Sequence, residues 1–339
     1  MKRQDIETRK VISDIMRDSA RGAKQEKCFI CGKVQTSFCN SHLIPRAILE
    51  NVAVDGKVLT SNALLNISCI DIDSGLAKTW TFRFICRECD SKMFCNYEAT
   101  GALLQYPADI MLSEIALKNS LMMLYKQYHD KTTFQIFGDR GMIKGGLDIK
   151  EEEISLNIVD YSTNARKAKR FIEQNKTDEY RIIFYCVLDW KAPIAVQSSI
   201  TIHRDLNGDV LNDIYDYSDT VRMQDVHLCI FPYEQKTAVL LFYYKNEHLC
   251  EKFAKQFATL SLEKKLEYIN YLIFRYTEHF ALSAKVLQET KNKKLRKLFK
   301  QHGDEGEMGV ISMHRMKDRP KHINPHEIPN FLSKKMALN

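Results

Sequence analysis

Apolar and polar positions follow two different periods along the chain. Segments with apolar residues at helical spacing fall at 107–128, 161–174, 247–260 and 261–287. Runs rich in β-branched and aromatic residues fall at 180–190, 194–203, 226–232 and 237–244. The polar residues 234–237 separate the last two runs and predict a hairpin turn. The pattern therefore predicts an α+β fold in which these strands form an antiparallel sheet.

Shorter elements are predicted nearer the N-terminus. Short strands are expected around 34–42 and 79–85, and a helix over 90–98. Residues 1–26 carry apolar side chains at nearly helical spacing, with Lys and Arg on the other faces. This segment is expected to form a basic amphipathic helix.

The chain length and composition indicate a globular protein of two domains. The sequence has 339 residues, of which 45% are hydrophobic, enough to bury substantial cores. We divide it into a basic N-terminal helix (1–26), a cysteine-containing module (27–100), an α+β domain (101–290) and a basic C-terminal tail (291–339). Within the tail, which we expect to be mobile, the segment HINPHEIPNF is the part expected to dock in extended form.

The charge of the chain is unevenly distributed. The net charge is +7, and the run KNKKLRKLFK at 291–300 holds six basic residues. Such a run can neutralise nucleic-acid phosphates without reading sequence, although a solvated helix face gives the same pattern. No apolar stretch approaches the roughly 20 residues needed to span a membrane. Ten cysteines without a signal peptide point to a reducing compartment, so we expect a cytoplasmic protein without a membrane partner.

Four of the cysteines form two C-x-x-C pairs. Cys28 and Cys31 lie in KCFICGK, and Cys86 and Cys89 lie in FICRECD. Two cysteines at this spacing can reach one metal from a tight turn, and a second pair completes a tetrahedral zinc site. Structural zinc is therefore the expected cofactor. Cys39 and Cys95 break the pattern and are expected to be buried free thiols.

Between and after these pairs lie residues that resemble a known family. The segment SHLIPR contains Ser41, His42 and Pro45, and Asp90 directly follows the last cysteine. Together with the four cysteines, these residues resemble the HNH, or ββα-metal, endonucleases in their four-cysteine form. The resemblance covers about residues 27–100. It implies a treble-clef zinc module that carries a nuclease site.

What the resemblance implies for chemistry is phosphodiester hydrolysis. His42 would be the general base that activates water, and Asp90 would help to hold a catalytic Mg²⁺ or Mn²⁺. Glu98, about two helical turns after Asp90, would add a second carboxylate. Cations placed to contact phosphate are Arg46, Arg87 and Lys92. The expected partner is nucleic acid, with DNA favoured over RNA.

The chain departs from the family at three positions. Ser41 stands where an Asp or His ligand is usual, and Asp90 replaces the commoner His or Asn. The family's middle asparagine has no clean counterpart, because Asn62 and Asn66 fall well before Cys86.

The alternatives from the residues alone stay open. Asp90 is also a suitable helix cap, Glu98 a suitable solvated helix residue, and His42 a suitable structural histidine. The rival function is a non-catalytic zinc-containing protein that binds nucleic acid or acts in regulation. The resemblance further suggests a bacterial anti-phage effector. A regulatory protein or further copies of the chain are the other partners considered.

Overall fold

The structure is a computed structural model that describes residues 14–62, 69–142, 147–214, 216, 218, 221–306 and 323–338. Its strands are β1 (Ser41–His42), β2 (Lys57–Asn62), β3 (Cys69–Gly75), β4 (Thr81–Phe82), β5 (Tyr180–Leu188), β6 (Ile194–Thr201), β7 (Asp225–Tyr233), β8 (Lys236–Tyr244) and β9 (Phe280–Leu282). Its α-helices are α2 (Arg46–Val52), α3 (Arg87–Met93), α4 (Asp109–Asp139), α5 (Leu147–Glu173), α6 (His248–Ala258), α7 (Leu262–Tyr276) and α8 (Lys293–Gly306). Residues 14–22 are also helical, and short 3₁₀ turns include η2 (Leu76–Lys78).

The centre of the molecule is an antiparallel sheet. Over the described residues it has seven strands in the order β3-β2-β9-β6-β7-β8-β5, and every neighbouring pair is antiparallel. β1 and β4 form a separate two-stranded ribbon, in which Ser41 pairs with Phe82 and His42 with Thr81. The predicted α+β class is confirmed.

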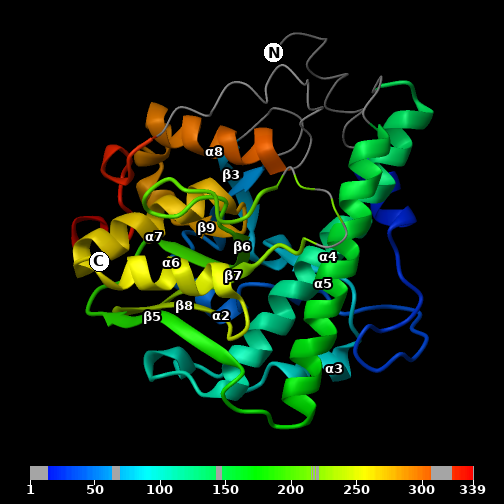
Figure 1. Cartoon of the computed structure of the whole chain (residues 1–339), viewed down its shortest axis with the longest axis horizontal. Coiled ribbons are helices and arrows are strands. Elements are labelled where there is room, and N and C mark those ends of the chain that lie inside the picture. Colours follow the sequence, from blue (N-terminus) through cyan, green and yellow to red (C-terminus); the bar gives the residue numbers. More distant parts are fainter. Residues whose placement is uncertain are drawn as a thin grey trace.

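Helices cover both faces of this sheet (Figure 1). Leu228 and Ile230 of β7 pack into a core shared with α6, α7 and α8, whereas Cys229 and Phe231 pack into a second core shared with α2, α4 and α5. Both side-chain sets are apolar because both faces are buried. This explains why the strand runs read as continuous hydrophobic sequence instead of an alternating pattern.

The long helix α4 lies inside the molecule for half of its length. Residues 112–122 are all buried, which requires neighbours on every side of the helix. α5 packs along it as an antiparallel partner, β6 lies on another side, and the ribbon strand β4 on a third. Polar side chains in this stretch must therefore find partners inside the protein.

Most predicted elements are confirmed, with shifted ends. The four predicted strands correspond to β5–β8, and the turn between β7 and β8 holds Glu234 at φ 52°. The helix predicted over 90–98 is α3, which begins at Arg87 and ends at Met93. The helix predicted over 261–287 is wrong beyond Tyr276, because the chain then forms β9 between β2 and β6.

Both ends of the described chain are packed against the rest. Ile15 and Ser19 are buried, and Thr133 of α4 donates a hydrogen bond to Ser19 at 2.8 Å. Residues 1–13 of the predicted N-terminal helix lie outside the described residues. Beyond α8, Phe331 and Leu332 are completely buried in the core, so residues 323–338 are docked and not a free tail.

The segment assigned to the cysteine module contributes to the large sheet. β2 and β3 form a hairpin, and Leu59 of β2 pairs with Leu282 of β9. The cysteine-containing region is thus tied to the later part of the chain by strand pairing. In the described part of the chain, no helix combines the length and the apolar character needed to cross a bilayer.

Candidate metal centre and the polar cluster beside it

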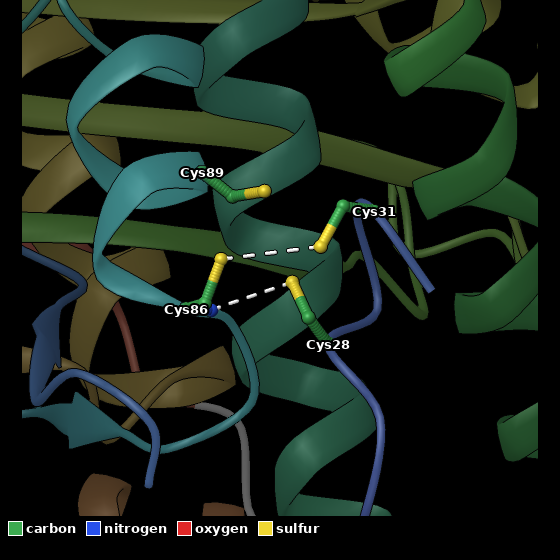
Figure 2. A group of neighbouring side chains, drawn as sticks. All are labelled: Cys28, Cys31, Cys86 and Cys89. Atoms are coloured by element: carbon green, nitrogen blue, oxygen red, sulfur yellow. Dashed lines mark hydrogen bonds between the residues drawn. The ribbon is translucent and has the colours of Figure 1, made fainter. Parts of the chain in front are cut away.

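The two cysteine pairs meet at one point. The four Sγ atoms of Cys28, Cys31, Cys86 and Cys89 all lie within 4.8 Å of one another, and those of Cys31 and Cys86 are 4.0 Å apart. The side chains converge from a loop and from the start of α3 (Figure 2). A Zn–S bond of about 2.3 Å in tetrahedral geometry separates two sulfurs by about 3.8 Å. The cluster therefore fits one structural metal ion such as zinc.

Backbone turns hold each pair in position. The N–H of Gly32 donates to the Cys28 carbonyl at 2.8 Å, and the N–H of Cys28 donates to Lys33 at 2.9 Å. Gly32 has φ 70°, which a residue without Cβ adopts easily. Cys86 is the N-cap residue of α3, so Cys89 follows about one turn later on the same side.

The surroundings of the thiols differ across the cluster. Burial raises the pKa of Cys28 and of Cys89. The backbone N–H of Lys33 lowers the pKa of the exposed Cys31 to about 7. Zinc binds thiolates and displaces their protons, so an ion would offset the cost of ionising the buried members.

The other two predicted free thiols have different environments. Cys39 is half-buried, donates to the Ile85 carbonyl at 3.3 Å, and has its pKa raised to about 12 by burial. Cys95 is exposed, so the prediction that it is buried is wrong. It lies just past the end of α3, where its thiol donates to the Lys92 carbonyl.

His42 is held by a backbone carbonyl. Its Nε2 lies 2.9 Å from the carbonyl oxygen of Leu76, the first residue of η2. A carbonyl can only accept, so Nε2 carries the hydrogen, and in the neutral ring Nδ1 keeps a free lone pair. The side chain is half-buried. A histidine in this state can accept a proton at Nδ1.

Ser41 joins the ribbon to α3. Its hydroxyl is buried and donates to Asp90 Oδ1 at 2.5 Å. Asp90 lies inside the first turn of α3, and its own N–H donates to the Cys86 carbonyl. The alternative in which Asp90 caps the helix is therefore wrong, because the N-cap position belongs to Cys86.

A buried lysine lies between the two predicted carboxylates. The side chain of Lys118 in α4 is 2% exposed, contacts the Glu98 carboxylate directly and lies 3.8 Å from Asp90 Oδ1. Its ammonium also lies 4.2 Å from the centre of the Phe94 ring. Glu98 is thus paired with a buried lysine and lies beyond the end of α3, so the alternative in which it is a solvated helix residue without a partner is wrong.

The same cluster continues into the sheet through hydrogen bonds. The Tyr97 hydroxyl donates to Glu98 at 3.3 Å and accepts from Gln197 Nε2. Gln197 also donates to Asn119 Oδ1, and Asn119 Nδ2 lies 3.2 Å from His227 Nδ1. These side chains link α3 and α4 to the centre of the sheet.

Ser41 and His42 have different contacts although they are neighbours. Successive residues of an extended strand point to opposite sides, so Ser41 meets Asp90 while His42 meets Leu76. Within the described residues, no hydrogen bond or ion pair joins His42 directly to Asp90. The structure gathers Asp90 and Glu98 around Lys118 and joins Ser41 to Asp90, whereas the His42 ring contacts Leu76.

The predicted phosphate contacts are exposed, and two of them have local partners. Arg46 Nε lies 3.0 Å from Glu50, and Lys92 Nζ lies 2.8 Å from Glu88. Arg87 is exposed at the start of α3. Of the asparagines considered, Asn62 ends β2 and Asn66 lies outside the described residues.

Sequence reasoning missed Lys118 and Asn119. Both stand inside the run LSEIALKNSLMML, where polar residues interrupt a helix that is apolar on all sides. A charged residue at such a position is almost never buried unless it is paired. That interruption was the available signal, and it pointed to an internal partner for Lys118.

Comparisons with protein-family models, with curated proteins and with solved structures each found no match.

Proposed function

We propose that this chain is a metal-dependent phosphodiesterase of the HNH type, built on a treble-clef zinc module and acting on DNA. The observation that carries the proposal is the hydrogen bond from Ser41 to Asp90. It places a carboxylate of α3 against the residue next to His42. Asp90, the candidate metal ligand, directly follows Cys89, and His42, the candidate base, is the neighbour in β1 of the residue that Asp90 contacts.

In the proposed reaction each side chain has one task. His42 Nδ1 accepts the proton of the attacking water, while the Leu76 carbonyl fixes the ring orientation through Nε2. Asp90 offers its second oxygen, Oδ2, to a divalent ion, and Ser41 holds Oδ1 in place. When bound, Mg²⁺ or Mn²⁺ would polarise the phosphate and stabilise the leaving oxygen.

Lys118 restricts the chemistry of the second carboxylate. Its ammonium neutralises Glu98, so Asp90 is the remaining carboxylate of this group with an oxygen available. Mg²⁺ usually keeps several waters and takes only one or two protein carboxylates. A single-carboxylate site is compatible with that preference.

One observation favours a second candidate function. The Lys118 ammonium already supplies a cation close to both carboxylates, and removing a buried charge from its partners is costly. A chain that needs no second metal would be a zinc-containing DNA-binding protein without catalysis. In that case Asp90, Glu98 and Lys118 would serve only to hold α3 on α4.

A cleavage assay separates the two candidates. Plasmid and linear duplex DNA, with single-stranded DNA and RNA beside them, are incubated with the zinc-loaded chain and Mg²⁺, Mn²⁺ or EDTA. The variants are His42→Ala and Asp90→Asn, with the exposed His248→Ala and Asp73→Asn as matched controls. We expect metal-dependent cutting that is lost in the first pair and kept in the controls.

Other results would contradict the first candidate. Duplex binding without cutting in any metal supports the non-catalytic protein. Cutting that survives His42→Ala contradicts the proposed base.

A further inference from the structure

The outer face of α8 is basic while its inner face is apolar. Leu295, Leu298 and Phe299 are completely buried in the core that α6 and α7 share. The intervening positions carry Lys and Arg, all of them exposed. The helix is therefore fixed to the protein by one side and presents a positive surface on the other.

The basic residues of α8 divide into two groups. Lys294 contacts Glu327, and Arg296 Nη2 lies 2.7 Å from Asp71 of β3, so these two tie the helix to its neighbours. Lys293, Lys297 and Lys300 are exposed, and among the described side chains none of them has an ion-pair partner. Their spacing of four and three residues puts them on one stripe of the helix.

This stripe differs from lysines that are paired within their own helix. Lys92, Lys169 and Lys255 each lie within 2.9 Å of a glutamate one helical turn away. The segment 291–303 contains no acidic residue. α8 carries five basic residues, and its two acidic residues, Asp304 and Glu305, follow at its C-terminal end, so the helix keeps an excess of positive charge.

We infer that Lys293, Lys297 and Lys300 of α8 form a contact surface for the phosphate backbone of duplex DNA. This inference rests on the proposed function, since it takes DNA as the substrate of the His42 site. The stripe spans eight residues, from Lys293 to Lys300, and its seven steps of 1.5 Å cover about 10 Å of helix. One DNA strand carries one phosphate per about 3.4 Å of axis, so the stripe matches about three phosphates.

The surface also lies at a useful distance from the candidate site. Arg296 holds α8 to Asp71, and β3 continues from there to Gly75, which directly precedes Leu76, whose carbonyl holds His42. Figure 1 shows α8 beside β3. Five residues of extended strand cover about 17 Å, which equals about five base pairs. A DNA duplex cut at His42 therefore reaches α8 when it extends about five base pairs beyond the cut.

The test is the salt dependence of duplex binding, measured with EDTA present so that no cutting occurs. The triple variant Lys293→Gln, Lys297→Gln, Lys300→Gln is compared with Lys169→Gln, Lys245→Gln, Lys255→Gln, which removes the same charge from paired lysines. Each phosphate contact contributes about 0.9 to the slope of log affinity against log salt. We expect the magnitude of this slope to be smaller by about 2–3 in the α8 variant than in the wild type. Near 0.15 M salt we expect its affinity for duplex DNA to be about 100-fold weaker.

Three results would overturn the inference: an unchanged slope in the α8 variant, an equal loss in both triple variants, or wild-type binding to anionic vesicles but not to duplex DNA. The His42→Ala cleavage assay reports separately on the proposed function. If cutting survives His42→Ala while the α8 variant loses its slope, the nuclease site is wrong and the DNA surface stands.

Discussion

The ammonium of Lys118 in α4 is in direct contact with the carboxylate of Glu98, which lies in the turns that follow α3. Lys118 is 2% exposed and Glu98 is 31% exposed, so the pair has one buried and one partly hydrated member. Lys118 also lies 3.8 Å from Asp90 Oδ1. A single cation thus holds two carboxylates of the candidate site on α4.

Lys118→Met should destabilise the fold. The thioether fills similar space, but Glu98 is left without its cation and Asp90 loses a nearby charge. Breaking one side of a buried pair costs about 3–5 kcal/mol, and partial hydration of Glu98 places the expected loss near the lower end, at about 3 kcal/mol. The free energy of unfolding in urea measures it.

The matching control is an exposed pair. Lys92→Met removes the partner of Glu88 on the surface of α3, and no measurable loss is expected there. Glu98→Gln combined with Lys118→Met should recover part of the loss, since the uncompensated charge is gone. A Lys118→Met protein as stable as wild type would show that the pair does not stabilise α3.

The purified chain should contain one zinc ion held by the four cysteines. Cys31→Ser tests this with little change in packing, because Cys31 is exposed. The expected result is loss of zinc by elemental analysis and a lower unfolding temperature, because the metal's binding energy contributes to folding. Cys95→Ser, also exposed, should keep the full metal content. Equal metal content in both variants would argue against this ligand set.

Ser41→Ala should lower the free energy of unfolding by less than Lys118→Met does, but by more than the replacement of a surface serine. The lost hydrogen bond runs to a carboxylate, and bonds to charged groups contribute about 1.5–3 kcal/mol. Asp90 is 27% exposed, and water can replace part of that bond. We expect the free energy of unfolding in urea to fall by about 1–2 kcal/mol. Ser91→Ala, whose exposed hydroxyl donates to the Glu88 carbonyl, is the control and should change little.

The cysteine centre could be predicted from local spacing, whereas contacts between side chains far apart in the sequence could not. A C-x-x-C pair fixes its own geometry within one turn, so four such residues could be assigned to one metal from sequence. The partner of Asp90 depends on which side of β1 faces α3. Sequence reasoning placed His42 near Asp90, and the structure shows that Ser41 makes the contact.

The strand β9 was not predicted either, because it too depends on partners that are distant in the sequence. β9 has three residues, Phe280–Leu282, too few for a period-two pattern to be recognised. It is defined by its neighbours, since Leu282 pairs with both Leu59 and Ile194. The strands β5–β8 were predicted because each is long and strongly apolar, and such runs are readable without knowledge of their partners.

The protein should lose stability as the pH falls from 7 to 5, in part because of His279. Burial lowers the pKa of His279 from 6.5 to about 4, with Lys126 acting in the same direction and Glu278 against it. Its Nδ1 lies 3.3 Å from the Ser198 hydroxyl, and the Trp80 ring packs against it edge-on. Between pH 6.5 and 4 the unfolded chain therefore binds a proton that the folded chain does not.

The sign follows from that difference in bound protons. The stabilising contribution is complete above pH 6.5 and is lost as the pH falls toward 4, at about 1.4 kcal/mol per pH unit. His279→Gln should lower stability at pH 7 but reduce the drop between pH 7 and 5 by about 2 kcal/mol in urea unfolding. Asp130, whose pKa is raised to about 6 by burial, opposes this trend, so Asp130→Asn should steepen the drop. The exposed His248→Gln should leave it unchanged, and an identical drop in His279→Gln and wild type would assign the acid sensitivity to other groups.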